Sequence, residues 1–326
     1  MRLGGNAAYL QDITSPGQIH EAIEWADSNK LPVVMIGDGS NIVWGDAGFN
    51  GLVLVNKIPG YEIQHQGEQS FVTAGAGEPW DSVVARTVME ELSGIEQLSF
   101  IPGTTGATPV QNVGAYGREI KDVLVCVQAY DRVEKKMVVI PKIECEFGYR
   151  TSRFKTKDKG RFFITSITLT LTKLPPYPPF YASVDKYLKD HNIKKPTASQ
   201  IREAVIEIRT SKLPDPAVVA NCGSFFHNPL VEPAKLAELQ VDYPEIVYWL
   251  TDNGKVKLSA AWMLEQLGLK GYKEPNTGMS VWPKQALVLV NEKAPNTASL
   301  IAFRNAIVAA VEKKFGITLQ QEPELI

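Results

Sequence analysis

The chain has 326 residues, of which 44% are hydrophobic and 21% charged, a composition typical of a globular protein with two or three domains. Its formal net charge is −2, so no excess of basic residues exists to attract DNA or a membrane surface, and neither partner is expected. No segment reaches the ~18 consecutive apolar residues of a membrane span, and the N-terminal sequence MRLGGNAAYLQDI has no apolar signal sequence. We therefore expect a soluble protein that is not secreted.

The three cysteines and four histidines lack the spacing of a metal site or of a disulfide framework. Cys126, Cys145 and Cys222 are far apart in the sequence, and no CxxC pair occurs. We expect each cysteine to be a buried thiol and no metal to be bound.

The N-terminal part predicts a helix followed by three strands. The helix begins with Ser15 as the N-cap and Pro16 at the first helical position, and Gln18 completes a capping box. The segments LPVVMIG, GLVLV and SFVTAGAG are typical of strands. An amphipathic helix follows from about Trp80 to Leu92.

Residues 101–117, with the sequence IPGTTGATPVQNVGAYG, are rich in glycine and proline and follow neither a strand nor a helix period. Loops of this length inside a compact domain are usually functional or disordered, and the apolar content argues against disorder. The sequence therefore predicts a long structured loop with a function.

The second half of the chain predicts three strands and then mostly helices. The strands are DVLVCVQAY, KKMVVI and RFFITSITLTLT, and the proline-rich segment 174–180 predicts a domain boundary. Thr197 and Gln200 predict a second capping box. A strand, QALVLVN, precedes the last helix. The predicted helices lie near residues 182–190, 198–211, 232–239, 258–267 and 297–315.

Two glycine-rich segments are candidates for a binding site. The first, GDGSN at residues 37–41, taken alone favours a turn between two strands. It also suits a phosphate cradle, because glycine lets the backbone approach a ligand. It does not match GxGxxG, and no GxxxxGK[ST] loop occurs. The second, residues 101–117, offers backbone donors and polar side chains to a large flat ligand with a pyrophosphate. Together the segments favour a phosphate-bearing cofactor.

Eight motifs in order, GDGSN, AGAGEPW, IPGTTGATPVQNVGAYG, FGYRTSRFK, TSKLPDP, NCGSFFHNP, QALVLVN and EPE, resemble the UDP-N-acetylenolpyruvoylglucosamine reductases, the MurB family. The resemblance covers nearly the whole chain. It implies an α+β fold in which a two-subdomain FAD-binding module of the vanillyl-alcohol-oxidase (PCMH) type precedes an α+β substrate-binding domain. We expect the FAD-binding domain at 1–174, with subdomains of about 1–57 and 58–174. We expect the substrate domain at 175–326, its C-terminal tail returning to the active site.

The resemblance implies a bacterial cytoplasmic enzyme of peptidoglycan precursor synthesis, expected to be a monomer. FAD is bound without a covalent link, and NADPH and UDP-N-acetylglucosamine enolpyruvate are the small-molecule substrates. Hydride passes from NADPH to FAD and then to the alkene of the enolpyruvyl group. The implied FAD-binding residues are Gly37, Asp38, Gly39, Ser40, Asn41, Ile101, Pro102, Gly103, Thr104, Gly106, Ala107, Gln111, Asn112, Gly114, Ala115 and Tyr116.

Three residues are implied to be catalytic: Arg150 from YRTS, Ser224 from NCGSFF and Glu324 from EPE. Hydride addition leaves an enediolate-like anion, which Arg150 can stabilise together with a protonated Glu324. The hydroxyl of Ser224 can then supply a proton. The implied substrate-binding residues are Tyr149, Tyr181, Lys212, Asn228 and Gln285.

Members of this family carry further residues, including a Thr-Thr pair, before the segment that begins MRLGG. Either the natural chain starts upstream of Met1, or the first subdomain lacks part of its sheet and binds FAD less well. Two other functions stay open: an FAD-linked oxidase of the same superfamily, and a protein that binds FAD or a UDP-sugar without turnover. Oxidases lack the paired NCGSFF and EPE motifs, which favours the reductase.

Overall fold

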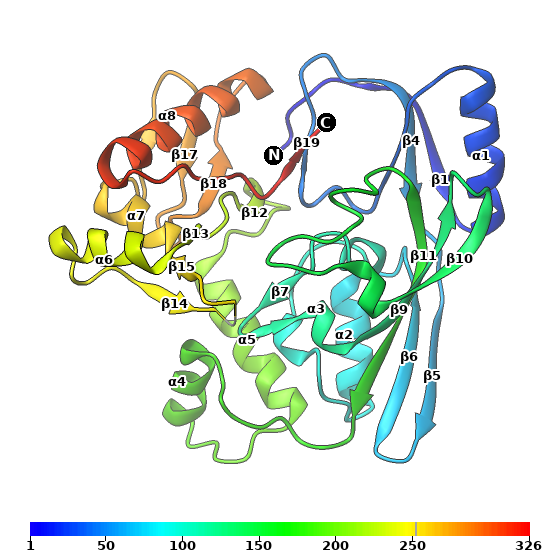
Figure 1. The fold of residues 1–326 in the computed structure, drawn as a ribbon, viewed down its shortest axis with the longest axis horizontal. Helices are drawn as coiled ribbons and strands as arrows, with labels where there is room; N and C mark the ends of the chain where they lie inside the picture. Colours follow the sequence, from blue (N-terminus) through cyan, green and yellow to red (C-terminus); the bar gives the residue numbers. More distant parts are fainter. Residues whose placement is uncertain (252) are drawn as a thin grey trace. The chain divides into compact units, whose positions relative to one another are not determined.

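The computed structural model describes residues 1–251 and 253–326, which form two compact units (Figure 1). The N-terminal unit contains residues 7–40 and 49–209. The C-terminal unit contains residues 1–6, 41–48 and 210–326. No described helix combines the length and the apolar character that crossing a membrane requires.

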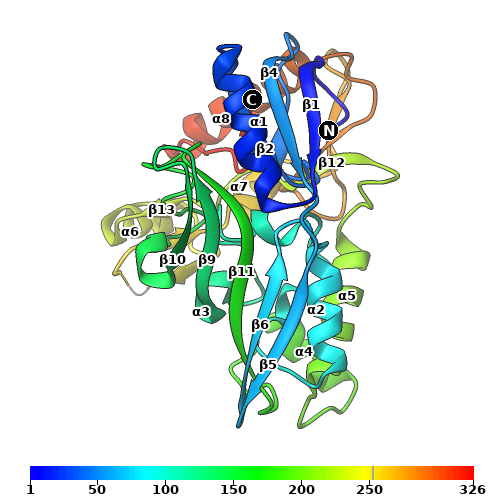
Figure 2. The ribbon, with the colours of Figure 1, turned by 90° about the vertical axis from the view of Figure 1, so that its right-hand side faces the viewer.

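The first sheet of the N-terminal unit has three parallel strands in the order β1-β4-β2, and helix α1 lies along it (Figure 2). The predicted start of the helix is confirmed: α1 begins at Pro16, and the Ser15 amide donates to the Gln18 side-chain oxygen at 3.2 Å, as a capping box requires. Its buried apolar residues, which include Ile19 and Ile23, pack with those of β4. The bounds are β1 Ala7–Ile13, α1 Pro16–Ser28, β2 Val33–Ile36 and β4 Phe49–Asn56.

The second sheet of this unit has five antiparallel strands in the order β10-β9-β11-β6-β5. In β11 buried and partly exposed residues alternate over most of its length, as a half-buried strand requires. Helix α2 packs on this sheet through Trp80, Val83 and Val84. The bounds are β5 Tyr61–Gln66, β6 Gln69–Gly75, α2 Trp80–Met89, β9 Leu124–Asp131, β10 Lys136–Pro141 and β11 Phe162–Thr172.

The connection between α2 and β9 contains five short elements, and a sixth follows β10. They are η1 Glu96–Leu98, η2 Thr105–Ala107, β7 Gly114–Ala115, β8 Arg118–Glu119, α3 Ile120–Val123 and, after β10, η3 Lys142–Cys145.

Residues 175–209 lie in the N-terminal unit, and the long C-terminal stretch of the other unit begins at residue 210. The domain boundary near residue 174 stays a prediction. Helices α4 (Ala182–Asp190) and α5 (Ala198–Lys212) share a small apolar core. The predicted Thr197–Gln200 capping box of α5 is confirmed by hydrogen bonds of 3.0 and 3.3 Å. Arg202 of α5 donates to both carboxylate oxygens of Asp81 at 2.5 and 2.8 Å, which ties this segment to α2.

The C-terminal unit contains a four-stranded sheet in the order β12-β18-β17-β16 and a three-stranded sheet in the order β13-β15-β14. The three predicted helices and the predicted strand are confirmed, whereas the short strands β12 to β17 were not predicted. The helices are α6 Pro233–Asp242, α7 Ala260–Gln266 and α8 Thr297–Phe315. The strands are β3 Ile42–Val43, β12 Ala220–Ser224, β13 Leu230–Val231, β14 Tyr248–Leu250, β15 Val256–Leu258, β16 Lys273–Glu274, β17 Met279–Val281, β18 Val288–Asn291 and β19 Glu324–Leu325.

Candidate active site

The two glycine-rich segments meet in the N-terminal unit. The Ser40 hydroxyl donates a hydrogen bond to the Pro102 carbonyl at 3.2 Å. A Cβ atom on Gly37 would lie 2.1 Å from Oγ1 of Thr104, so only glycine fits where these segments touch. Gly39 has a φ of 70°, and a Cβ there would meet no atom within 4 Å. The first segment therefore lies against the second and presents an open turn of backbone, as an anion-binding cradle requires.

The AGAGEPW segment holds the start of the long loop. The backbone amide of Trp80 donates to the Gly103 carbonyl at 2.9 Å, and that of Gly106 donates to the Ala76 carbonyl at 2.9 Å. The hydroxyl of Thr105, which is fully buried, donates to the Glu78 carbonyl at 3.0 Å. The Thr105 side chain and the neighbouring backbone amides are thus engaged within the protein, and they fix the start of the loop to the AGAGEPW segment.

The segment that carries Arg150 is bonded to the same loop. Arg150 Nη2 donates to the Gly114 carbonyl at 2.7 Å, and Asn112 Nδ2 donates to the Gly148 carbonyl at 2.9 Å. The Ser152 hydroxyl donates to the Val110 carbonyl at 2.6 Å. These three hydrogen bonds fix the arginine segment to residues 110–114.

Three residues of these two segments have a left-handed backbone conformation. Asn112, Tyr116 and Arg150 have φ values of 47°, 50° and 53°, which non-glycine residues rarely adopt. Such conformations cost of order 1–3 kcal/mol each and persist only where the surrounding structure holds them, often at functional sites. The strain therefore supports a functional role for both segments.

Two of the predicted tyrosines lie together in the N-terminal unit. The rings of Tyr116 and Tyr181 meet edge to face, with centroids 5.6 Å apart. Tyr181 directly precedes α4 and is 42% exposed, so its ring is accessible on one side. The Tyr149 ring lies beside the Arg150 guanidinium at 5.5 Å.

Arg209 is a residue of this region that sequence reasoning missed. Its Nε donates to the Phe100 carbonyl at 3.0 Å, and its side chain is hydrogen-bonded to Tyr116. Burial lowers the pKa of its guanidinium, and the neighbouring Tyr116 partly opposes this shift. Arg209 thus bridges the two ends of the long loop, and the signal for it was its place directly before TSKLPDP.

In the C-terminal unit, Ser224 is the last residue of β12 and pairs with Val288 of β18. Gly223 before it has a φ of 75°, and the backbone amide of Phe225 after it donates to the Leu287 carbonyl at 2.7 Å. Among residues 1–251 and 253–326, the Ser224 hydroxyl has no hydrogen-bond partner, so it can donate to a substrate.

The C-terminal tail brings Glu324 to Asn41, within the C-terminal unit. The tail first passes the Ser224 segment, where Glu322 N donates to the Phe225 carbonyl at 2.9 Å. Strand β19 then pairs with β3 in parallel, and Glu324 N donates to the Asn41 carbonyl at 3.0 Å. The tail therefore connects the Ser224 segment, Glu324 and Asn41 within one unit.

The three remaining predicted substrate residues also lie in the C-terminal unit. The Asn228 side-chain oxygen accepts a hydrogen bond from Ala260 N at 3.0 Å, at the start of α7. The Gln285 side-chain oxygen accepts one from Leu287 N at 3.2 Å. The Lys212 carbonyl accepts one from Trp282 Nε1 at 3.0 Å. These bonds fix the side chains of Asn228 and Gln285 and the backbone of Lys212.

The cysteines take no part in these segments. Cys145 and Cys222 are buried thiols as predicted, whereas Cys126 is only partly buried. Burial raises the pKa of both buried thiols to about 12, so they are protonated and unreactive at neutral pH. Within the described ranges, no three His, Cys, Asp or Glu side chains are grouped so that they could hold a metal ion.

Two family models match parts of the chain. A model for the C-terminal domain of UDP-N-acetylenolpyruvoylglucosamine reductase matches residues 215–326. An FAD binding domain model matches residues 8–135.

Curated relatives and a solved structure match nearly the full length. A UDP-N-acetylenolpyruvoylglucosamine reductase from Ralstonia nicotianae is 40% identical over 100% of this chain and 95% of its own. One from Cupriavidus pinatubonensis is 39% identical over 98% of this chain and 94% of its own. The crystal structure of the MurB reductase from Thermus caldophilus has a TM-score of 0.66 at 19% identity, over 97% of this chain and 91% of that chain. These matches confirm the predicted fold class, an FAD-binding module followed by an α+β C-terminal domain.

Proposed function

The chain belongs to the UDP-N-acetylenolpyruvoylglucosamine reductase family, and on this premise we propose that it uses FAD and NADPH to reduce UDP-N-acetylglucosamine enolpyruvate to UDP-N-acetylmuramate. This reaction supplies a precursor of peptidoglycan. The observation that carries the proposal is the hydrogen bond between Arg150 and the Gly114 carbonyl, which joins an arginine on a strained backbone to the predicted flavin loop.

The N-terminal unit fits FAD. Glycine at positions 37 and 103 lets the two glycine-rich segments pack closely, because a Cβ atom there would clash with Thr104 and Ser40 respectively, and the turn at Gly39 stays open. When bound, FAD accepts a hydride from NADPH and delivers a hydride to the alkene. The residues proposed to hold it are the predicted ones of residues 37–41 and 101–116.

Arg150 is proposed to stabilise the anion that forms on the carboxylate side of the enolpyruvyl group. A guanidinium presents a planar fork that matches a carboxylate, and its positive charge is fixed in place before the reaction. The hydrogen bond to Gly114 holds this guanidinium against the predicted flavin loop.

Ser224 is proposed to donate the proton, and Glu324 to assist Arg150 in its protonated form. The lack of a hydrogen-bond partner for the Ser224 hydroxyl within the described part of the chain supports the first role. The pairing of β19 with β3 supports the second, because it fixes the end of the chain beside Asn41. Tyr149, Tyr181, Lys212, Asn228 and Gln285 are proposed to hold the UDP-sugar, with Lys212 serving as a point charge for the pyrophosphate.

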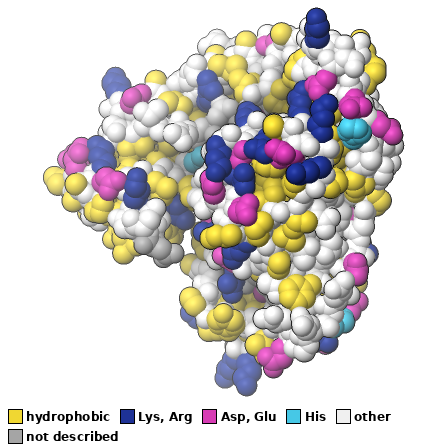
Figure 3. All heavy atoms as spheres, turned by 45° about the vertical axis from the view of Figure 1, so that its right-hand side comes forward, with side chains coloured by type: hydrophobic (Ala, Val, Ile, Leu, Met, Phe, Trp, Pro, Cys, Tyr) yellow, Lys and Arg dark blue, Asp and Glu magenta, His cyan; other side chains and the backbone are white. Residues whose placement is uncertain are grey.

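Small molecules are the only partners proposed, and the cytoplasm is the proposed location because NADPH and nucleotide sugars are found there. Basic and acidic side chains are interspersed on the face seen in Figure 3. No field of one sign covers this face, which supports the proposal that neither nucleic acid nor a membrane is a partner. We further propose that the enzyme acts as a monomer.

NADPH oxidation that depends on the enolpyruvyl sugar tests the function. A reductase consumes NADPH only when this sugar is present. An oxidase of the same superfamily would consume oxygen with a reduced substrate, and a binding protein would bind without turnover. Either of these results would overturn the proposal.

The bound FAD is expected to be released completely when the protein is precipitated with acid. Neither glycine-rich segment contains a histidine or cysteine to which a flavin could be attached. The absorbance of the supernatant and the pellet measures the release. Yellow colour that stays with the pellet would contradict a non-covalent link.

Gly37→Ala is expected to weaken FAD binding, because the new Cβ would lie 2.1 Å from Thr104 Oγ1 and force the two glycine-rich segments apart. Overpacking of this kind costs about 1–3 kcal/mol, or roughly 5- to 150-fold in the dissociation constant. Quenching of flavin fluorescence on binding measures the constant. Gly17→Ala is the control, since a Cβ there meets no atom within 4 Å and FAD affinity should not change. Equal affinity in both variants would show that the contact of Gly37 with Thr104 is irrelevant to FAD.

A further inference from the structure

The segment that carries Arg150 is a loop closed at its base by Arg153. The backbone amide of Arg153 donates to the Cys145 carbonyl at 2.9 Å. Its Nη1 donates to the Glu144 carbonyl at 3.1 Å. The backbone and the side chain of Arg153 thus hold the two ends of the loop together, with residues 144 and 145 at one end and Arg153 at the other. Arg150 lies between these ends in the sequence.

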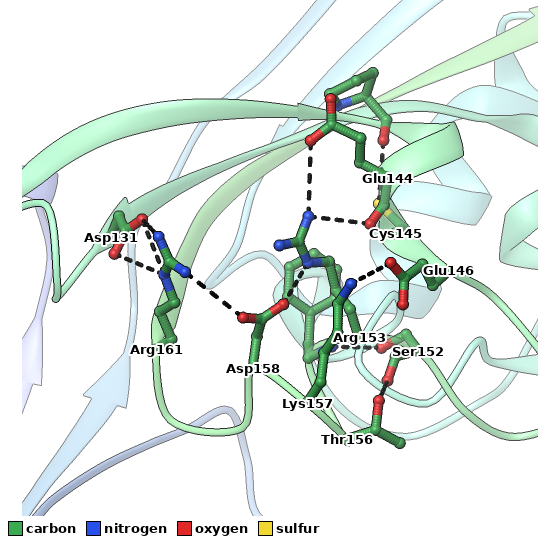
Figure 4. A network of polar contacts seen from close by, with 12 residues as sticks. Asp131, Glu144, Cys145, Glu146, Ser152, Arg153, Thr156, Lys157, Asp158 and Arg161 are labelled. Carbon is green, nitrogen blue, oxygen red and sulfur yellow. Dashed lines mark hydrogen bonds and ion pairs between the residues drawn. The ribbon is translucent and has the colours of Figure 1, made fainter.

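The Arg153 guanidinium is itself oriented by Asp158 (Figure 4). Asp158 Oδ2 accepts a hydrogen bond from Arg153 Nε at 2.6 Å, and the two side chains are only 15% and 11% exposed. The ring of Phe162 packs against the same guanidinium at 5.1 Å. An ion pair this well shielded is screened little by salt.

The pair is anchored in turn to the five-stranded sheet. Arg161 donates to both carboxylate oxygens of Asp131, the last residue of β9, at 2.7 and 3.1 Å. Arg161 also lies 3.8 Å from Asp158. The hydrogen bonds from Arg161 lower the pKa of Asp131, so this carboxylate stays ionised at neutral pH. A series of ion pairs with alternating charge therefore connects the sheet to the base of the Arg150 loop. Its members in order are Asp131, Arg161, Asp158 and Arg153.

Arg150 needs such support because its φ of 53° is strained and would relax if the loop were free. The three hydrogen bonds to residues 110–114 hold one side of the loop. They do not involve residues 144 and 145, where the loop begins. We propose that Arg153 and Asp158 are positioning residues, whose ion pair holds the Arg150 loop in the conformation that stabilises the anion formed from the substrate. This inference rests on the proposed function of Arg150.

Asp158→Asn is the first test, because it removes the charge and keeps the shape. It is expected to slow the oxidation of reduced enzyme by the enolpyruvyl sugar by about 10²-fold, the cost of a misplacement of about 1 Å. The reduction of the enzyme by NADPH should keep its rate, because Arg150 has no role in that step. Lys157→Gln is the matched control: it breaks an exposed ion pair with Glu146 in the same segment and should change neither rate. If Asp158→Asn does not fold, Arg153→Lys takes its place. This variant keeps the positive charge but lacks the planar guanidinium that bonds both Asp158 and the Glu144 carbonyl.

A double-mutant cycle separates positioning from general stability. If Asp158 acts through Arg150, Asp158→Asn should cost nothing further in an Arg150→Lys background. The inference would be overturned if the rate losses of the two single variants multiply in the double variant. Equal slowing of both half-reactions in Asp158→Asn would overturn it as well.

Hydrogen exchange of the amides of residues 146–151 tests the geometry without turnover. Asp158→Asn should speed exchange there, and Lys157→Gln should not. Unchanged exchange would overturn the inference even if the chain is a reductase. Faster exchange together with full activity of Arg150→Lys would instead refute the proposed role of Arg150, and with it the effect on catalysis.

Discussion

Ser224→Ala is expected to separate the two half-reactions. Reduction of the bound flavin by NADPH should keep nearly its normal rate, because no carbon atom is protonated in that step. The second half-reaction should slow by at least the ~10²–10⁴-fold that a positioned general acid contributes, since the proposed donor is gone. Stopped-flow absorbance of the flavin, with NADPH or with the enolpyruvyl sugar, measures each rate.

Two further variants make this result specific. Ser224→Cys keeps a proton on the side chain and should retain part of the activity. Ser280→Ala, in the same sheet, removes a buried hydroxyl that donates to Glu292 at 3.0 Å. It should lower stability without slowing either half-reaction. If Ser224→Ala slows both half-reactions equally, the serine holds the cofactor or the fold, and another group donates the proton.

Arg150→Lys is expected to lose about 10²–10³-fold in turnover although the positive charge is kept. A lysine is a point charge that cannot bind Gly114 and a carboxylate with one planar fork. Its shorter side chain and freely rotating ammonium would also release the bond that joins the loop to residues 110–114. Steady-state kcat with saturating NADPH and enolpyruvyl sugar measures the loss.

Arg132→Lys is the control for this variant, because Arg132 forms an ion pair with Asp27 at 2.5 Å elsewhere in the same unit. It should keep normal kcat. Near-normal kcat in Arg150→Lys as well would show that Arg150 contributes structure and no chemistry.

Local structure could be predicted where the determining contacts are close in sequence. The capping box of α1 needs only Ser15 and Gln18, three residues apart, and it forms as predicted. β11 follows from its alternating apolar residues. The order of the eight motifs likewise identified the family, because each motif is a short segment that can be read without the fold.

The short strands were not predictable, because their pairing partners are distant. Strand β12, which ends at Ser224, has five residues including a glycine and forms by pairing with β18. Strand β19 has two residues and exists because β3 pairs with it. Neither has enough local propensity to form alone, so only the tertiary contacts define them.

By itself, the sequence determined which residue types are available and in which motifs: the glycine-rich segments, Arg150, Ser224 and Glu324. Only the tertiary structure decided which of them meet, that Arg150 binds Gly114, that residues 175–209 pack in the N-terminal unit, and that Arg153 and Asp158 pair beneath the arginine loop. The reason is physical. A turn or a cap depends on neighbours within a few residues, whereas an ion pair or a strand register depends on which distant segments the burial of apolar surface brings together.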